Sequence, residues 1–225
     1  MTSANLCLFD LDHTLLPLDS DHAWGEFVVA LGWAEPAAQR AENDRFYAQY
    51  QDGSLDIEAY VEFATRAWRH RPPAEQAAAH ERFMAEVIRP ALRPEARALV
   101  ERHRAQGDLM AIVTATNEFV TRPIAAAFGV DALIAVELER DAQGRVTGRI
   151  RGVPSFRDGK TTRVEQWLGT QGRRVQDFER VAVYSDSMND LPLLELATHP
   201  VATNPSPALE ALARDRGWPL LKLFP

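Results

Sequence analysis

Short apolar runs alternate with helical patterns along most of this chain, and this alternation limits the folds that it can adopt. Apolar runs separated by helices are typical of a parallel sheet whose two faces are both covered. Five runs fit buried strands, at residues 6–9, 109–113, 133–136, 181–184 and 201–203. The sequence therefore predicts an α/β fold with a Rossmann-like, doubly wound parallel sheet.

The region at residues 17–93 has a different pattern, because it contains no strand run and its apolar residues recur at helical spacing. Aromatic stripes of this kind most often belong to a helix core. We expect a helical cap domain at residues 17–93, inserted after the first strand of an α/β core domain that comprises residues 1–16 and 94–225. The stripes are Trp24, Phe27, Val28 and Leu31, and then Ile57, Tyr60, Val61, Ala64 and Trp68.

A second departure from the alternating pattern occurs near residues 135–153. Val136 and Leu138 are followed, after the turn-like residues 141–144, by Val146 and Ile150. Alternating apolar residues on both sides of such a turn predict a β-hairpin that projects from the sheet.

Charge and chain start narrow the range of partners. The 225 residues carry a formal net charge of −7, whereas nucleic-acid binding needs a clustered basic surface. The residues before the first strand run are too few and too quickly followed by acidic ones for a signal sequence or a membrane span. We therefore expect a cytoplasmic protein, monomer or dimer, with no nucleic-acid or membrane partner. The single cysteine, Cys7, is expected in the core.

Two carboxylates follow the first strand run directly. Asp10 and Asp12 lie where the chain leaves the sheet, and open α/β sheets bind ligands outside the carboxyl ends of their strands. Such a pair alone is also common in solvated turns. Further polar signals follow in order at corresponding places, and a doubly wound sheet can gather them at one edge. They are Thr114 after the second run, Lys160 at a helix start, and Asp186, Asn189 and Asp190 after the fourth run.

Each of these signals has a structural alternative. Lys160 could be a surface lysine in a first helical turn, and Asp186 and Asp190 could belong to a capped turn before a helix. The order of the motifs favours the functional interpretation. A nucleotide-binding P-loop is excluded, because it needs a glycine five residues before Gly159, where Pro154 stands.

These residue types suit the hydrolysis of a phosphate ester. A phosphate dianion repels a carboxylate, and Mg²⁺ held between Asp10, Asp186 and the phosphate would cancel that repulsion. Lys160 would neutralise the nucleophile from the other side, and Thr114 would hydrogen-bond the phosphoryl group. Asp12 would protonate the leaving alcohol and then accept a proton from the attacking water.

In this order the motifs resemble those of the haloacid dehalogenase (HAD) superfamily, over about residues 6–204. The chain is most similar to subfamily IB phosphatases, the branch of phosphoserine phosphatases and histidinol-phosphate phosphatases, which have a helical cap just after the first motif. The resemblance implies a Mg²⁺-dependent phosphomonoesterase that hydrolyses a small phosphorylated metabolite through an aspartyl-phosphate. It also implies that Asp12 offers its backbone carbonyl to the metal and that Asp190 supports the residues that bind the metal.

Substrate choice is expected to depend on the cap and on the loop that leads into it. In phosphoserine phosphatases an acidic residue nine positions after the nucleophile contacts the substrate ammonium, and Asp19 has that position here. A helix N-cap at Ser20 or Asp21 explains this acidic cluster equally well. Ala115 and Asn189 are further candidates for substrate binding. For Asn189, capping of the following helix is the structural alternative.

The substrate itself stays open between histidinol phosphate and phosphoserine. Residues 50–56 lack the arginine-bearing helix with which phosphoserine phosphatases hold the substrate carboxylate, and Thr114-Ala115-Thr116 replaces their usual serine and glycines. These departures favour a cationic substrate without a carboxylate, such as histidinol phosphate.

Two other functions remain possible on the sequence. One is a different chemistry on the same scaffold, such as a phosphotransferase or phosphomutase. A dehalogenase is disfavoured by Asp12, since that reaction has no leaving alcohol to protonate. The other is a non-enzymatic phospho-acceptor domain, but receivers of that kind lack both a helical cap and the acid role of Asp12.

Overall fold

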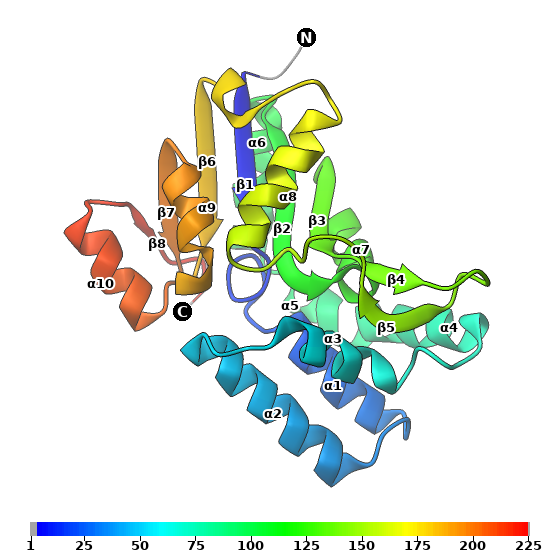
Figure 1. Cartoon of the computed structure of the whole chain (residues 1–225). Coiled ribbons are helices and arrows are strands. Elements are labelled where there is room, and N and C mark those ends of the chain that lie inside the picture. Colours follow the sequence, from blue (N-terminus) through cyan, green and yellow to red (C-terminus); the bar gives the residue numbers. More distant parts are fainter. Residues whose placement is uncertain (1–3, 225) are drawn as a thin grey trace.

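A six-stranded parallel sheet forms the centre of the computed structural model, which describes residues 4–224 (Figure 1). The strands lie in the order β3-β2-β1-β6-β7-β8, and each neighbouring pair is parallel. Their bounds are β1 Asn5–Phe9, β2 Leu109–Asn117, β3 Ala132–Val136, β6 Arg180–Ser185, β7 His199–Thr203 and β8 Leu220–Leu221. The predicted α/β fold and doubly wound sheet are confirmed.

The strands differ from the sequence-based prediction in two places. β2 continues past residue 113 to Asn117, and its register with β3 shifts between Val113 and Asn117. This extension carries the polar side chains that follow the apolar run. β8 was not predicted, because Leu220 and Leu221 are too few to form a recognisable alternating pattern.

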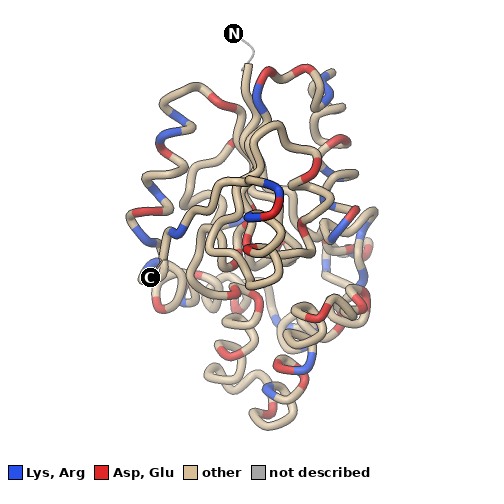
Figure 2. Tube along the Cα trace, turned by 90° about the vertical axis from the view of Figure 1, so that its left-hand side faces the viewer, with Lys and Arg blue, Asp and Glu red and all other residues tan. Residues whose placement is uncertain are grey.

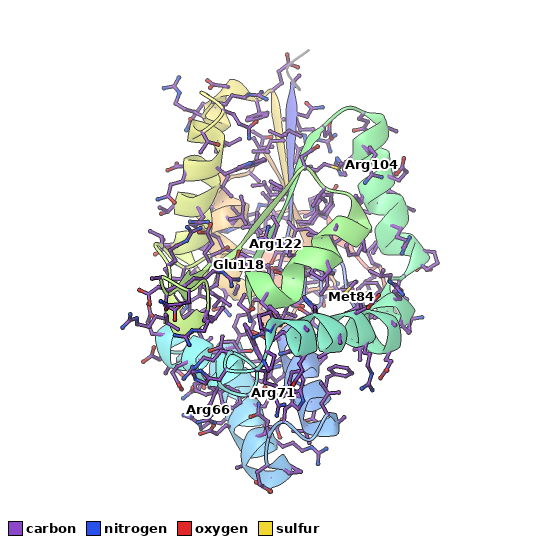
Figure 3. The ribbon with its side chains drawn as sticks, turned by 90° about the vertical axis from the view of Figure 1, so that its right-hand side faces the viewer. Arg66, Arg71, Met84, Arg104, Glu118 and Arg122 are labelled. Carbon is purple, nitrogen blue, oxygen red and sulfur yellow. The ribbon has the colours of Figure 1, made fainter. Side chains whose placement is uncertain are left out.

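Alternate side chains of β1 divide the core into two layers. Leu6 and Leu8 pack with the helices on one face, and Cys7 and Phe9 pack with those on the other, as expected for a strand buried on both faces. The first face is covered by α8 Asp158–Gly169, α9 Leu191–Leu196 and α10 Pro207–Asp215, and the second by α6 Pro94–Ala105 and α7 Glu118–Phe128. Figure 3 looks at the second face, with Arg104 on α6 and Arg122 on α7. Cys7 is fully buried, as expected.

Helices alone make up the named elements between β1 and α6, and they lie at the carboxyl ends of the strands (Figure 1). They are α1 Ser20–Ala30, α2 Pro36–Asp52, α3 Ile57–Arg66, α4 Pro73–Phe83, the π-helical turn η1 Met84–Ile88 and α5 Arg89–Ala91. We call the segment from α1 to α5 the insertion. It shares a hydrophobic core with α7, since Trp68 stacks on Phe119 with ring centroids 3.9 Å apart. Cap boundaries at residues 17 and 93 stay a prediction.

The predicted β-hairpin is present and leans on the helical insertion. β4 Leu138–Arg140 and β5 Val146–Ile150 pair antiparallel, and β5 packs against α3. Asp141 shapes the turn by accepting hydrogen bonds from the backbone N–H groups of Gln143 and Arg145, each at 2.9 Å. The hairpin therefore supports α3.

The outer helices carry charges of both signs. In Figure 2, Lys and Arg are interspersed with Asp and Glu along these helices. Among residues 4–224, none of the helices combines the length and the apolar character that crossing a bilayer requires.

A buried chain of hydrogen bonds fastens α6 to the sheet. His103 Nδ1 lies 2.7 Å from Asp108 Oδ2, and His103 Nε2 lies 2.9 Å from the hydroxyl oxygen of Tyr184 on β6. Asn5 Nδ2 donates to the second oxygen of Asp108 at 2.8 Å. His103, Asp108 and Tyr184 are all buried, so each of them depends on the others for its polar contacts.

We expect Tyr184→Phe to destabilise the fold by about 1–2 kcal/mol, because it leaves a buried ring nitrogen of His103 without its partner. The substitution keeps the aromatic ring that stacks on Phe9 at 5.2 Å. The change in the free energy of unfolding therefore measures the contribution of the hydroxyl alone. Urea denaturation followed by circular dichroism measures the change in the free energy of unfolding. An unchanged midpoint and slope would contradict the role given to this chain of hydrogen bonds.

Candidate active site

The polar side chains singled out in the sequence gather at the carboxyl edge of the sheet. Asp10 directly follows β1, and its backbone N–H donates to the carbonyl oxygen of Tyr184 at 2.9 Å. Thr114 lies in β2, Lys160 in the first turn of α8, Asp186 directly after β6, and Asp190 in the 3₁₀ turn η3 Met188–Asp190. The topology thus joins residues that are far apart in the chain.

Lys160 is the centre of this cluster. Its Nζ lies 2.7 Å from Asp10 Oδ1 and 2.6 Å from Asp190 Oδ1, and the residue is 1% exposed. Burial alone lowers the pKa of an amine, but Asp10 and Asp190 outweigh it and raise the pKa of Lys160. The amine therefore stays charged, and Asp190 contacts it directly. Ser185 Oγ donates to Asp190 Oδ2 at 2.8 Å and completes the support.

The second oxygen of Asp10 faces Asp186. Thr14 Oγ1 lies 3.2 Å from Asp10 Oδ2 and 3.1 Å from Asp186 Oδ1, so one hydroxyl separates the two carboxylates. Burial raises the pKa of Asp10 even though Lys160 opposes it. Burial, and then the charges of Asp10 and Asp190, raise the pKa of Asp186. Both carboxyl groups therefore need additional positive charge to be ionised together.

Carboxylate oxygens are hard ligands of the kind that Mg²⁺ binds. Among residues 4–224, no three or more His, Cys, Asp or Glu side chains are arranged to hold a metal ion together. Mg²⁺ commonly takes only one or two carboxylates and completes its shell with water and substrate phosphate. Asp10 and Asp186, with the backbone carbonyl of Asp12, would be the ligands in that mode.

Asp12 is held from two sides. Its Oδ1 accepts a hydrogen bond from the backbone N–H of Ser20 at 2.8 Å, and its Oδ2 accepts one from Thr116 Oγ1 at 2.8 Å. Burial and then the nearby charge of Asp19 raise the pKa of Asp12 to about 6. A carboxyl group with such a pKa can both donate and accept a proton near neutral pH.

Thr114 is 1% exposed and lies beside these carboxyl groups. Its Oγ1 accepts a hydrogen bond from the backbone N–H of Thr116 at 3.1 Å. The contact fixes the Thr114 side chain, and its hydroxyl can still donate to a phosphate oxygen.

A pocket extends from this cluster to α2 and α3. Carboxylates, histidines and aromatic rings line it, and within the described residues no Lys or Arg does. The lining side chains include Asp10, Asp12, Asp19, Asp186, His13, His22, Phe46, Tyr47, Tyr50 and Tyr60. Ile57 and Tyr60 of the aromatic stripes thus face the pocket, whereas Trp24 and Trp68 are core residues.

The three candidate substrate contacts lie in different surroundings. Asp19 lines the pocket and is itself the N-cap of α1, since its Oδ1 accepts from the N–H groups of Asp21 at 3.0 Å and His22 at 2.8 Å. Ala115 also lines the pocket. Asn189 instead donates its amide to the carbonyl oxygen of Tyr50 at 2.9 Å and so ties η3 to α2.

Sequence reasoning missed several polar residues that surround the cluster. Thr14 follows Asp10 by four residues in the loop after β1, and Thr116 follows Thr114 by two residues along β2, so spacing from a known motif could have identified both. Asp21 carried no such signal. It is buried, and Asn117 Nδ2 donates to its two oxygens at 3.2 and 3.3 Å.

Comparison with known proteins finds relatives along the whole chain. A family model described as haloacid dehalogenase-like hydrolase matches residues 7–195. A histidinol-phosphatase of Neisseria meningitidis serogroup C is 43% identical over 217 residues, which cover 96% of this chain and 98% of that protein. The crystal structure of a protein of unknown function from Bordetella pertussis Tohama I has a TM-score of 0.93 and 52% identity, and the match covers 99% of this chain and 100% of that one. A substrate-bound phosphoserine phosphatase has a TM-score of 0.68 at 17% identity over 98% and 93% of the two chains, which is a similarity of fold alone.

Gly159→Ala should disturb Lys160, because a Cβ at residue 159 would lie 2.0 Å from the carbonyl oxygen of Pro154. We expect a loss of about 1–3 kcal/mol in the free energy of unfolding, as for other overpacked positions. Turnover should fall by about 10², the scale of a misplaced transition-state group. Gly169→Ala is the matched control, since Gly169 ends the same helix and a Cβ there meets no atom within 4 Å. Equal behaviour of the two variants would refute this account.

Asp21→Asn should stabilise the protein more as the pH rises. Burial, and then the charges of Asp19 and Asp12, raise the pKa of Asp21 to about 7, although Tyr60 and Asn117 hydrogen-bond to it. A raised carboxyl pKa means that the folded state binds a proton more tightly, so this stabilisation is complete below the unfolded pKa and is lost as the pH rises through 7. Urea denaturation at pH 5 and pH 8 should give a variant-minus-wild-type difference that grows by on the order of 2–3 kcal/mol. A constant difference would argue against the protonated form.

Proposed function

The chain belongs to the haloacid dehalogenase-like hydrolase family and is a phosphatase, and we propose that it hydrolyses histidinol phosphate with Asp10 as the nucleophile. This membership agrees with the resemblance that the motifs carried. The relative that is 43% identical is named a histidinol-phosphatase, which supports the choice of substrate.

One observation carries the choice of substrate. Beyond the reacting edge, the pocket presents Asp19, the histidines and the aromatic rings, and none of its described lining residues is a Lys or Arg. Phosphoserine would bring a carboxylate into these negative surroundings, and like charges placed together cost several kcal/mol. Histidinol phosphate has an ammonium group and an imidazole ring there instead, which such a pocket can accommodate.

In the first half of the reaction, an oxygen of Asp10 forms a bond to phosphorus as the ester bond breaks. Lys160, 2.7 Å from Asp10 Oδ1, orients the carboxylate, and Thr114 hydrogen-bonds the phosphoryl oxygens. Asp10 and Asp186 would hold Mg²⁺, which would supply the positive charge that lets a carboxylate approach a phosphate dianion. Asp12 gives its proton to the oxygen of the leaving histidinol.

In the second half, water attacks the phosphorus of the aspartyl-phosphate. Asp12, now ionised, takes the proton of that water, and the bond between Asp10 and phosphorus breaks to release inorganic phosphate. Thr116 and the N–H of Ser20 keep the Asp12 carboxyl group in one place for both steps. A pKa of about 6 suits this alternation.

Phosphate release from a panel of esters tests the proposal. The panel holds histidinol phosphate, phosphoserine, a sugar phosphate and an aryl phosphate, each assayed with Mg²⁺ and with a chelator. We expect kcat/KM for histidinol phosphate to exceed that for phosphoserine at least about tenfold, as like-charge repulsion requires. A single stable phosphorylation without turnover would favour the phospho-acceptor function, and transfer to a second metabolite would favour the phosphotransferase.

Asp10→Asn should abolish turnover on every ester in this panel, because an amide oxygen is a poor nucleophile and binds Mg²⁺ less well than a carboxylate. Asp186→Asn should instead raise the Mg²⁺ concentration needed for half-maximal rate. Titration of Mg²⁺ at saturating substrate separates the two effects. Retained activity in purified Asp10→Asn would remove the nucleophile from the proposal.

A further inference from the structure

Tyr47 on α2 lines the pocket with a half-buried ring that has no role in the chemistry above. Its hydroxyl oxygen lies 3.2 Å from His13 Nε2. The ring stands between two imidazoles, with centroids 6.3 Å from His13 and 5.5 Å from His22 and tilts of 47° and 59°. Neither imidazole stacks flat on Tyr47, unlike the core pair Trp68 and Phe119 at 13°.

His13 is held in a backbone conformation that few side chains adopt. Its φ is +57°, in the left-handed region where residues other than glycine are uncommon, and such strain persists only where the surroundings impose it. Asn204 imposes it here, since its Nδ2 donates to the carbonyl oxygen of His13 at 2.9 Å. The backbone that carries the His13 imidazole is therefore held by Asn204.

The other side of the ring is fixed from within the insertion. His22 on α1 lies beside Tyr47, and its Nε2 is 3.1 Å from Asp44 Oδ1 on α2. One turn further along α2, the carbonyl oxygen of Tyr50 accepts the hydrogen bond from Asn189. His13 and Asn189 thus hold α2 at two points, one at Tyr47 and one at Tyr50. Tyr47 therefore has a defined position when the reacting groups are assembled.

The surroundings of Tyr47 favour a positively charged or polarisable ring as its partner. Asp19, Asp12 and Asp186 all act on Tyr47 and, after burial, raise its pKa, so its hydroxyl stays neutral and its ring remains uncharged. A neutral phenol ring with carboxylates nearby attracts cations to its face. It also pairs with another aromatic ring in offset or tilted geometry.

We propose that Tyr47, positioned by His13, selects substrates that carry an aromatic ring by packing against that ring in the pocket. This inference rests on the proposed phosphatase function but is separate from it, because Tyr47 takes no part in bond making. Its role is to lower KM for a ring-bearing ester, and a ring-free ester has nothing for it to bind.

Two esters isolate the contribution of the ring. O-phosphoethanolamine is histidinol phosphate without the imidazolylmethyl group, and both carry the ammonium and the phosphate. For the wild-type protein with Mg²⁺, kcat/KM should be at least about 10² higher for histidinol phosphate. Tyr47→Ala should reduce this ratio by about tenfold, mainly through KM for histidinol phosphate, a size suited to the loss of one aromatic contact. Tyr47→Phe keeps the ring and should retain most of the ratio.

Trp33→Ala is the control for general damage to the insertion. Trp33 packs on the same hydrophobic cluster as α1 and lies under the guanidinium of Arg71 at 4.3 Å, but it does not line the pocket. This variant should lower the melting temperature and leave the ratio of the two kcat/KM values as in the wild type.

The outcomes separate this inference from the proposed function. Equal losses on both esters in Tyr47→Ala, or an unchanged ratio, would overturn the role of Tyr47 while hydrolysis by Asp10 stood. A loss in Tyr47→Phe as large as that in Tyr47→Ala would also overturn it, since the hydroxyl and not the ring would then be responsible. Turnover that persists in Asp10→Asn would instead refute the proposed function.

Discussion

A single buried amine holds the reacting edge together. Lys160 contacts Asp10 and Asp190 at once, and removing one partner of such a buried pair leaves an uncompensated charge that costs several kcal/mol. The three residues come from β1, α8 and η3, so their contact depends on the order of the strands in the sheet. One amine does not balance the carboxylates of Asp10, Asp12, Asp186 and Asp190. Burial first, and then the charges of neighbouring carboxylates, raise the pKa values of these four groups.

The insertion and the sheet build the pocket jointly. Phe46 and Leu55 of the insertion pack with Phe156, which lies just before the N-cap residue of α8, the helix that carries Lys160. The N–H of Ser20, at the start of α1, holds Asp12. Movement of the insertion would therefore displace Asp12 and α8, the helix that carries Lys160, as well as the walls of the pocket. Binding of the distant end of a substrate and alignment of the reacting groups are coupled through these contacts.

The sequence was sufficient for the main architecture, because that rests on local patterns. The strand runs and the hairpin turn at residues 141–144 were readable, and the motif positions converge because parallel strands end at one edge. The roles of the candidate residues stay proposals. Non-local contacts were not readable, since no periodicity shows that Thr116 reaches Asp12 across 104 residues or that Asn189 contacts Tyr50. The sequence favours a helix core for the aromatic stripe over residues 57–64, because helical spacing does not distinguish a core from a pocket wall.

Asn204 links two distant parts of the chain, with a consequence for biosynthesis. Its amide nitrogen holds the loop at His13 and Thr14, and its Oδ1 accepts a hydrogen bond from the backbone N–H of Leu223 at 2.7 Å. The loop made first is thus stabilised by a residue made 191 positions after His13. While a ribosome has yet to add that residue, the emerging chain can form helices of the insertion but lacks the contacts that shape this loop. A partly synthesised molecule would then bear the carboxylates of this loop without the geometry that the complete chain gives them.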